Sequence, residues 1–300
     1  MKTLVPDYYQ KFSCLASACR HTCCIGWEID IDEDTEKRYL SISRDQNDPM
    51  SEKMVRSVKF STRRERRKGI PGHFLLLGEE ERCPFLTEDG LCEIILQKGE
   101  RALCQICTDH PRFRNHFPDH IEMGLGLTCE EACRIVLSEE RPAGYAFLSA
   151  GEEADTEEGT PEFLKCILPE EIRRIPDGEI DWADWADIFL SLERLDEGWT
   201  LYLQNLRDHA DCPHYNGFET AEWKNVLERL KEYLLYRHFM DYGHDFCELI
   251  WNLILRIAET EAFLKGNLSF ADFSEIVRLY SGEIEYSDEN RELIMNELEY

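Results

Sequence analysis

Apolar residues recur at helical spacing through the second half of the chain. They lie three or four positions apart, so that each set covers one face of a helix. The sets fall within residues 182–195, 223–234, 246–257, 270–280 and 288–298. Ser269 and Ser287 precede the last two sets, where a serine side chain can cap the first turn. The pattern predicts an antiparallel array of helices, with the tryptophans in its core because they share the faces of the aliphatic residues.

The first half of the chain has a shorter and less regular pattern. Residues 26–40 predict an extended piece that turns into a helix, and residues 72–94 predict two short strands around the Asp89-Gly90 turn. Short elements among many cysteines indicate a bound inorganic centre, which can contribute on the order of 10 kcal/mol to folding. The expected fold class is therefore mainly α: a cysteine-rich irregular N-terminal module with short β hairpins around a metal centre, plus a helical C-terminal module.

A segment of almost no apolar content separates these halves. The sequence SAGEEADTEEGTP at 149–161 has two glycines and a closing proline, which is typical of a linker or an exposed loop. We therefore expect a cysteine-rich module at 1–148, an acidic linker or loop at 149–161 and an acidic α-helical module at 162–300.

Composition and termini narrow the class of protein. The 300 residues are 43% hydrophobic and 11% aromatic, enough for a substantial packed core. The N-terminus lacks the apolar run of a secretory signal, and no segment approaches the roughly 18 uncharged apolar residues of a membrane span. We expect a cytoplasmic protein without membrane insertion.

Charge is distributed unevenly along the chain. Residues 1–134 hold 20 Lys and Arg against 23 Asp and Glu, whereas residues 135–300 hold 14 against 38, a net −24 of the total −27. Nucleic-acid binding needs a basic footprint, so no nucleic-acid partner is expected. The one basic run, at 59–69, is compatible with an acidic partner, but such runs are usually solvated loops or helix faces.

Ten of the thirteen cysteines lie in the first 134 residues. An odd number in a reducing compartment argues against a disulfide framework and favours metal binding. Only Cys104 and Cys107 have the C-x2-C spacing of a zinc knuckle. The first cluster reads C-x4-C-x3-C-C, and iron–sulfur clusters tolerate irregular spacing better than a single zinc ion does. The spacing therefore favours iron–sulfur, with zinc as the alternative metal.

Four cysteine motifs follow one another in a distinctive order. They are CLASACRHTCCIGW at 14–27, CPFLTEDGLC at 83–92, CTDHPR at 107–112 and LTCEEA at 127–132. In this order they resemble the motif set of the flagellin lysine-N-methylase family, part of a wider group of cysteine-rich zinc- or iron-chelating proteins. The resemblance implies an iron–sulfur protein that methylates lysine side chains of flagellin in the bacterial cytoplasm, with S-adenosylmethionine as methyl donor.

The resemblance also implies a set of metal ligands. Carried over position by position, they are Cys14, Cys19, Cys23, Cys24, Cys83, Cys92, Cys107 and Cys129. Eight thiolates suffice for two 4Fe-4S clusters, or for one cluster with spare thiols. Cys104 and Cys133 lie where the family is not expected to have cysteines, so neither is included.

No donor-binding or catalytic residue can be assigned from the sequence. The chain has no C-x3-C-x2-C triad of radical S-adenosylmethionine enzymes. Its GLGL at 124–127 lacks the third glycine and the following helix expected of the loop in an ordinary methyltransferase. Methylating an amine needs no metal, because a deprotonated lysine is itself a nucleophile. The expected function is protein-lysine N-methyltransferase acting on flagellin. The alternatives are an iron–sulfur or zinc-chelating module with an electron-transfer or adaptor role.

Overall fold

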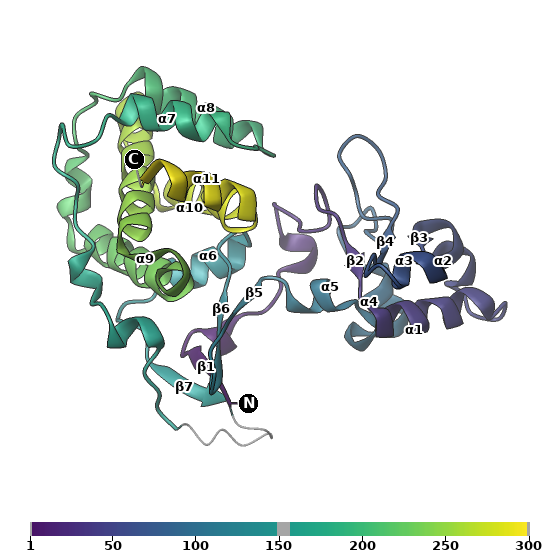
Figure 1. Ribbon diagram of the computed structural model, residues 1–300. Coiled ribbons are helices and arrows are strands. Elements are labelled where there is room, and N and C mark those ends of the chain that lie inside the picture. Colours follow the sequence, from purple (N-terminus) through teal and green to yellow (C-terminus); the bar gives the residue numbers. More distant parts are fainter. Residues whose placement is uncertain (1, 149–156, 299–300) are drawn as a thin grey trace. The chain divides into compact units, whose positions relative to one another are not determined.

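The computed structural model describes residues 2–148 and 157–298, and it confirms a mainly α fold (Figure 1). Contacts divide the chain into two compact units. The cysteine unit comprises Cys14–His110, and the helical unit combines Met1–Ser13 with Pro111–Tyr300. Within the described residues, no helix has the length and apolar character needed to cross a membrane.

The two units differ from the modules expected from the sequence. Residues 111–148, expected in the cysteine-rich module, belong to the helical unit because their strands pair with the N-terminal strand. Of the expected linker at 149–161, residues 149–156 lie outside the described residues. Directly after them, Glu158 forms a bridge with Ala146, and the Gly159 amide donates to the Tyr145 carbonyl at 3.0 Å.

The helical unit contains a four-stranded sheet. Its strands are β1 (Lys2–Pro6), β5 (Arg112–His116), β6 (His120–Leu125) and β7 (Tyr145–Leu148), in the order β5-β6-β1-β7. β1 runs parallel to β6, with Leu4 opposite Glu122, and antiparallel to β7. Burial nearly alternates along β6, as expected for a strand with one face on the core. The N-terminal strand thereby fixes the position of residues more than a hundred positions away.

Helices supply most of the helical unit and its core. They are α6 (Glu130–Leu137), α7 (Trp182–Ser191), α8 (Glu197–Asp208), α9 (Ala221–Lys265), α10 (Phe270–Tyr280) and α11 (Asp288–Leu298), with 3₁₀ turns at Tyr9–Lys11, Glu162–Lys165, Pro169–Glu171 and Asn216–Glu219 and a π-helical turn at Ser281–Glu285. Trp182, Trp199 and Trp251 are buried among aliphatic residues of these helices, which confirms that these tryptophans belong to the core.

The predicted helix starts are confirmed where a cap defines them. Ser269 accepts from the Asp272 amide at 3.1 Å, and Ser287 accepts from the Asn290 amide at 3.2 Å. The sets at 223–234 and 246–257 lie on the two helical segments of α9, which are separated by a non-helical kink at Gly243 (φ 77°, ψ −171°). That conformation suits glycine because it has no Cβ.

The cysteine unit is built from short elements. Its helices are α1 (Glu33–Arg44), α2 (Ser51–Ser57), α3 (Arg63–Arg66), α4 (Glu93–Lys98) and α5 (Gln105–Asp109), with 3₁₀ turns at Ala16–Ala18 and Glu100–Ala102. A small sheet has the order β2-β4-β3, from Asp30–Ile31, Gly72–Phe74 and Val58–Lys59. The predicted extended piece and helix at 26–40 are confirmed as β2 and α1. The predicted hairpin at 72–94 is reduced to β4 and two isolated bridges, Leu77 to Arg82 and Leu86 to Cys92, the second of which spans the Asp89-Gly90 turn.

A small apolar cluster forms the core of the cysteine unit. Tyr39, Phe74 and Phe85 are buried in it together with the thiols of Cys83 and Cys104. The Tyr39 hydroxyl donates to the Ala102 carbonyl at 2.8 Å, which connects α1 to the segment before α5. Thiols are thus an integral part of this core.

Candidate metal centre

The cysteine unit gathers seven of the eight predicted ligands. They are Cys14, Cys19, Cys23, Cys24, Cys83, Cys92 and Cys107, and the unit also holds Cys104. The remaining predicted ligand, Cys129, lies in the helical unit, where it precedes α6.

Cys24 and Cys83 form the first close pair. The Cys83 amide donates to the Cys24 carbonyl at 2.8 Å, which fixes the two backbones side by side. Hydrogen bonds from the thiols of Cys23 and Cys83 lower the pKa of Cys24, while the pairing with Cys24 and burial raise the pKa of Cys83. Hydrogen bonds from neighbouring thiols favour the deprotonated form of a cysteine, and a cysteine must be deprotonated to bind a metal.

Cys104 and Cys107 form the second close pair. Their Sγ atoms are 3.4 Å apart across the first turn of α5, and Cys104 is fully buried. A hydrogen bond from Cys107 lowers the pKa of Cys104, and the same bond, with burial, raises the pKa of Cys107. This is a C-x2-C knuckle that presents two sulfurs on one turn.

The two pairs and Cys92 lie close enough for a charge on one thiol to change the pKa of another. Burial raises the pKa of Cys92, and negative charge on Cys24 and Cys104 raises it further. Charge on Cys24 and Cys83 likewise contributes to the raised pKa of Cys107. Several thiolates so placed repel one another, and a bound cation removes that repulsion. The donor set therefore fits a thiolate-bound metal or iron–sulfur centre.

The first cysteine motif surrounds a tight turn. Cys14 and Cys23 are exposed and Cys19 is half-buried, on either side of the 3₁₀ turn Ala16–Ala18. The Ala16 amide donates to Cys14 Sγ at 3.4 Å, and Ala16 has a positive φ of 50°. A non-glycine residue in this region stores strain, which is common at ligand-binding segments.

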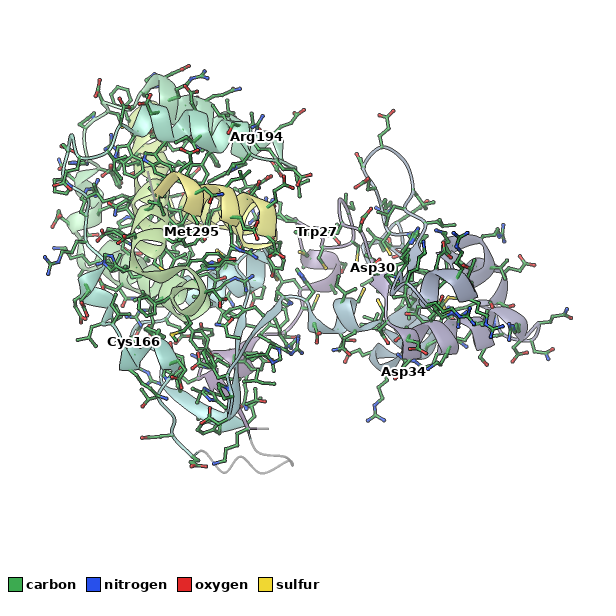
Figure 2. The ribbon with its side chains drawn as sticks, viewed as in Figure 1. Trp27, Asp30, Asp34, Cys166, Arg194 and Met295 are labelled. Atoms are coloured by element: carbon green, nitrogen blue, oxygen red, sulfur yellow. The ribbon has the colours of Figure 1, made fainter. Side chains whose placement is uncertain are left out.

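The other cysteines occupy ordinary surroundings. Cys133 is buried in the helical core, its thiol donates to the Ser274 carbonyl at 3.5 Å, and burial raises its pKa. Cys212 and Cys247 are also buried, and Cys166 is exposed (Figure 2). These thiols behave as packing groups or surface residues.

Cys104 is the residue that sequence reasoning left out of the ligand set. Its C-x2-C spacing from Cys107 was the available signal, but the family motif carried no cysteine at this position. The structure pairs the two sulfurs and buries Cys104 beside Cys83 in the same apolar cluster.

A pocket of about 790 Å³ also lies in the cysteine unit, between the start of α1 and the basic run. Arg63, Arg66 and Arg67 line it, and Arg66 donates to the Ser61 carbonyl at 2.9 Å. Among the described residues, the guanidinium groups of Arg63 and Arg67 form no hydrogen bond or ion pair. Ser61 is 5% exposed and its hydroxyl has no partner within the described part of the chain. The basic run thus forms one wall of a pocket with unused donors.

Carboxylates also line this pocket. Asp32 caps α1 by accepting from the Thr35 amide at 2.9 Å, and its other oxygen accepts from the Gln105 amide at 2.8 Å. Glu36 is buried and accepts from the Ser61 amide. A ligand here would meet both guanidinium groups and carboxylates.

Comparisons with known proteins find similarity to proteins named for lysine methylation and for flagellar biosynthesis. No family model and no solved structure matches it. It is 30% identical over 134 residues to "Lysine-N-methylase" of Salmonella typhimurium and to the protein of the same name of Salmonella choleraesuis, and 29% identical over 134 residues to "Flagellar biosynthetic protein FliU" of Salmonella muenchen.

The matched segment is a limited part of this chain and of its longer relatives. It is 45% of this chain, 32% of each lysine-N-methylase and 76% of the flagellar biosynthetic protein. The chain therefore spans about a third of the length of the two lysine-N-methylases that it matches. Over that segment the comparisons confirm the resemblance indicated by the cysteine motifs, and the chain is similar to curated lysine-N-methylases.

Proposed function

We propose that this chain is a cytoplasmic protein-lysine N-methyltransferase that acts on flagellin and holds an iron–sulfur cluster in its cysteine unit. The similarity to two proteins named for lysine methylation and one named for flagellar biosynthesis carries the proposal. S-adenosylmethionine is the proposed methyl donor.

The thiols of the cysteine unit support the cluster. Cys24, Cys83, Cys104 and Cys107 form two close pairs, and Cys92 lies within their electrostatic reach. We propose these five as the source of the ligands to a 4Fe-4S cluster, with Cys14, Cys19, Cys23 and Cys129 as additional candidates from the motif set. A bound cluster would supply order that the small core of this unit lacks, on the order of 10 kcal/mol.

The reaction itself requires a neutral lysine amine. From a pKa near 10.4, only about one lysine in 2500 is neutral at pH 7, so the amine must be desolvated or must lose its proton to a base. The excess of carboxylates in residues 135–300, a net −24, would attract a lysine-rich surface and raise the rate of encounter. Such long-range attraction weakens as salt shortens the screening distance to about 8 Å.

The arginine-lined pocket is the place that we propose for the donor. The amino-acid end of S-adenosylmethionine carries a carboxylate, which suits Arg63 and Arg67, and an ammonium, which suits the carboxylates of Asp32 and Glu36 in the same lining. The Ser61 hydroxyl adds a buried donor or acceptor. The volume of about 790 Å³ falls in the usual range for small-molecule sites, about 300–1,000 Å³.

The identity of the metal is tested on protein purified without oxygen. We expect a brown protein that contains both iron and labile sulfide, because sulfur-to-iron charge transfer gives such clusters their colour. Colourless protein with stoichiometric zinc and no sulfide would replace the iron–sulfur cluster with a structural zinc site.

The enzymatic proposal is tested separately. We expect the iron-loaded chain to transfer labelled methyl groups from S-adenosylmethionine to purified flagellin. A fully loaded chain that transfers none would favour the second candidate function, a metal-chelating or electron-transfer module. The paired thiols of the cysteine unit favour that candidate, because they could bind a metal without any methyl transfer.

A further inference from the structure

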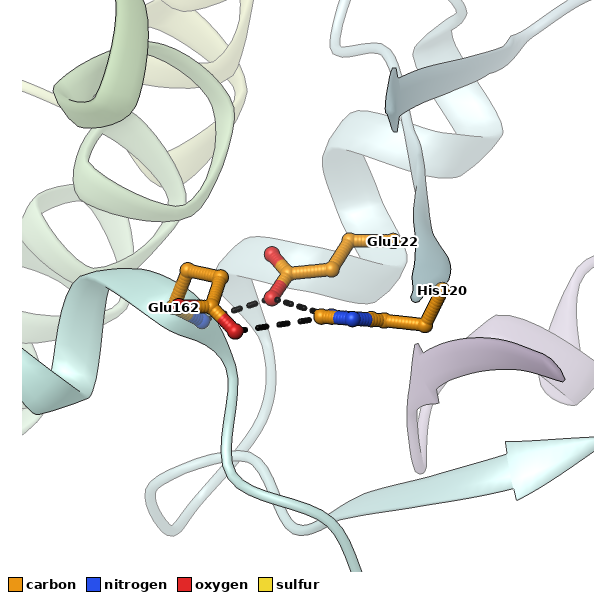
Figure 3. A group of neighbouring side chains, drawn as sticks. All are labelled: His120, Glu122 and Glu162. Carbon is orange, nitrogen blue, oxygen red and sulfur yellow. Dashed lines mark hydrogen bonds and ion pairs between the residues drawn. The ribbon is translucent and has the colours of Figure 1, made fainter. Parts of the chain in front are cut away.

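A second cluster of side chains that can bind a metal lies in the helical unit, and it contains no cysteine. His120 and Glu122 are two positions apart on β6 and therefore point to the same face of the strand. Glu162 begins the 3₁₀ turn Glu162–Lys165. Figure 3 shows the three side chains converging, with their ligand atoms all within 4.8 Å of one another.

The separations between these atoms suit a single ion. His120 Nε2 is 3.3 Å from Glu122 Oε1 and 3.9 Å from Glu162 Oε1. Neighbouring ligands that each lie about 2.0–2.2 Å from a metal are about 2.8–3.1 Å apart in octahedral geometry and about 3.3–3.6 Å apart in tetrahedral geometry. Binding would therefore require only a small contraction, chiefly of Glu162.

The imidazole is already oriented for coordination. Its Nδ1 lies 2.9 Å from an Asp119 carboxylate oxygen, which leaves Nε2 facing the two glutamates. A carboxylate behind a histidine in this way is the usual outer-sphere support of a metal-bound imidazole. Phe117 stacks on the ring at a centroid distance of 5.1 Å and Phe147 meets it edge-on at 6.1 Å, so the ring is also held by packing.

Two carboxylates face one imidazole in this cluster. Glu122 is 1% exposed and His120 5% exposed, and burial raises the pKa of Glu122. Glu122 Oε1 also accepts from the Glu162 amide at 2.6 Å, which holds the two carboxylates together. Lys165 reaches Glu162 at 2.5 Å, but its side chain is 52% exposed and can turn away into solvent. A divalent ion would compensate both carboxylates at once.

We propose that His120, Glu122 and Glu162 form a binding site for a divalent transition-metal ion, with Asp119 as a positioning residue. One imidazole and two carboxylates suit Mn²⁺ and Fe²⁺, whereas thiolates select softer metals. The ion would join β6 to the segment that begins at Glu162. This site neither supports nor depends on lysine methylation.

The competing account is an ordinary ion pair. Although burial opposes it, Asp119 and Glu122 raise the pKa of His120, so a protonated imidazole can satisfy the cluster without metal. The two accounts differ in whether the intact protein takes up a hard divalent ion.

Mn²⁺ is the appropriate probe because it favours carboxylate over thiolate ligands. The experiment titrates Mn²⁺ into the full chain, with its cysteine unit loaded, and follows loss of the free-ion signal by electron paramagnetic resonance. We expect one ion per chain. Glu162→Gln, at a partly exposed position that should not affect folding, and Glu122→Gln should each weaken binding at least tenfold, and Asp119→Asn about tenfold.

A matched control separates ligation from loss of a buried charge. Glu283→Gln removes a carboxylate that is 4% exposed and accepts from backbone amides of Leu195 and Asp196, outside this cluster. It should leave Mn²⁺ binding unchanged, as should Cys104→Ser. Wild-type protein that binds no Mn²⁺, or Glu162→Gln and Glu122→Gln variants that bind as tightly as wild type, would overturn the proposal in favour of the ion pair.

Discussion

The Sγ atoms of Cys104 and Cys107 lie 3.4 Å apart at the start of α5, with Cys104 fully buried. A short helix begins between them, so the backbone directs both sulfurs to one side. The family motif contributes only Cys107 to this pair. Cys104 is more buried than Cys107, and its sulfur is as well placed to bind a metal.

Substituting Cys104 should therefore reduce metal content. In Cys104→Ser and in Cys107→Ser we expect iron per chain to fall by about half or more, because a hydroxyl is a poor ligand for the iron of these clusters. Iron and sulfide analysis of anaerobic protein measures this effect. Cys133→Ser is the matched control, since Cys133 is equally buried in the other unit. If Cys133→Ser lost iron while Cys104→Ser kept it, Cys133 and not Cys104 would be the metal ligand.

If S-adenosylmethionine binds in the arginine-lined pocket, its affinity should depend on Arg63 and Arg67. Arg63→Gln combined with Arg67→Gln should weaken binding of S-adenosylmethionine at least tenfold, because two charged hydrogen-bond donors to its carboxylate are lost. Calorimetric titration of the iron-loaded chain measures this affinity. The control is Arg56→Gln, which removes an exposed arginine that pairs with Glu52 on α2, outside the pocket lining. Equal affinity in the double variant and the control would place the donor elsewhere.

Local signals in the sequence predicted local structure well. Ser269 and Ser287 cap helices at the expected positions, because a cap involves a side chain and an amide only three residues away. The apolar spacing of residues 270–280 coincides with α10 for the same reason. The turn at Asp89-Gly90 is also present, with Gly90 at a φ of 74°.

Features that join distant segments were not predictable in this way. The sheet pairs β1 with β6 and β7, and no periodicity in residues 2–6 indicates those partners. Glu162 lies close to His120 although more than forty positions of sequence separate them, and the pocket joins α1 to the basic run. Such sites depend on the tertiary fold, so only a motif with fixed spacing can reveal them beforehand. Helix α8 was missed although Trp199, Leu203 and Leu206 have helical spacing.

A buried carboxylate should dominate the stability of the helical unit. Glu285 is fully buried, accepts from the Tyr233 hydroxyl at 2.8 Å and lies 3.4 Å from Arg237 Nε and 3.0 Å from His238 Nε2. Glu285→Gln leaves the buried Arg237 without its counter-ion, which should lower the free energy of unfolding by about 3–5 kcal/mol. Urea unfolding followed by tryptophan fluorescence reports on this unit, which holds five of the six tryptophans. The exposed Glu289→Gln should change it by less than about 0.5 kcal/mol, and equal effects of the two variants would contradict the role of Glu285.

His238 and Glu285 make the stability of the helical unit depend on pH. Burial lowers the pKa of His238, so the unfolded chain takes up a proton before the folded chain does as pH falls below about 6.5. Although burial opposes it, Arg237 and His238 lower the pKa of Glu285, whose contribution is present above about pH 4.3 and is lost on further acidification. Both groups therefore make the helical unit less stable toward acid. His120 acts in the opposite sense, because its raised pKa adds stability below about pH 6.5 that is lost at higher pH.

The bend in α9 should depend on its glycine. At Gly243 a Cβ would meet nothing within 4 Å, so the cost of Gly243→Ala comes from its φ of 77° rather than from a clash. We expect the free energy of unfolding to fall by about 1–3 kcal/mol, measured by the same urea assay. Gly144→Ala, at a position without positive φ and with its nearest contact at 3.4 Å, is the control. A Gly243→Ala variant as stable as wild type would show that the bend is not required.

Methyl transfer to flagellin is the direct test of the central claim. The measurement is mass spectrometry of purified flagellin after incubation with S-adenosylmethionine and the anaerobic, iron-loaded chain, compared with the Arg63→Gln, Arg67→Gln double variant and with Arg56→Gln. The account predicts added methyl groups on surface lysines with the wild type and with Arg56→Gln, and few or none with the double variant. Flagellin left unmodified by a folded, fully loaded wild-type chain would contradict the account and leave metal chelation or electron transfer as the function of the cysteine unit.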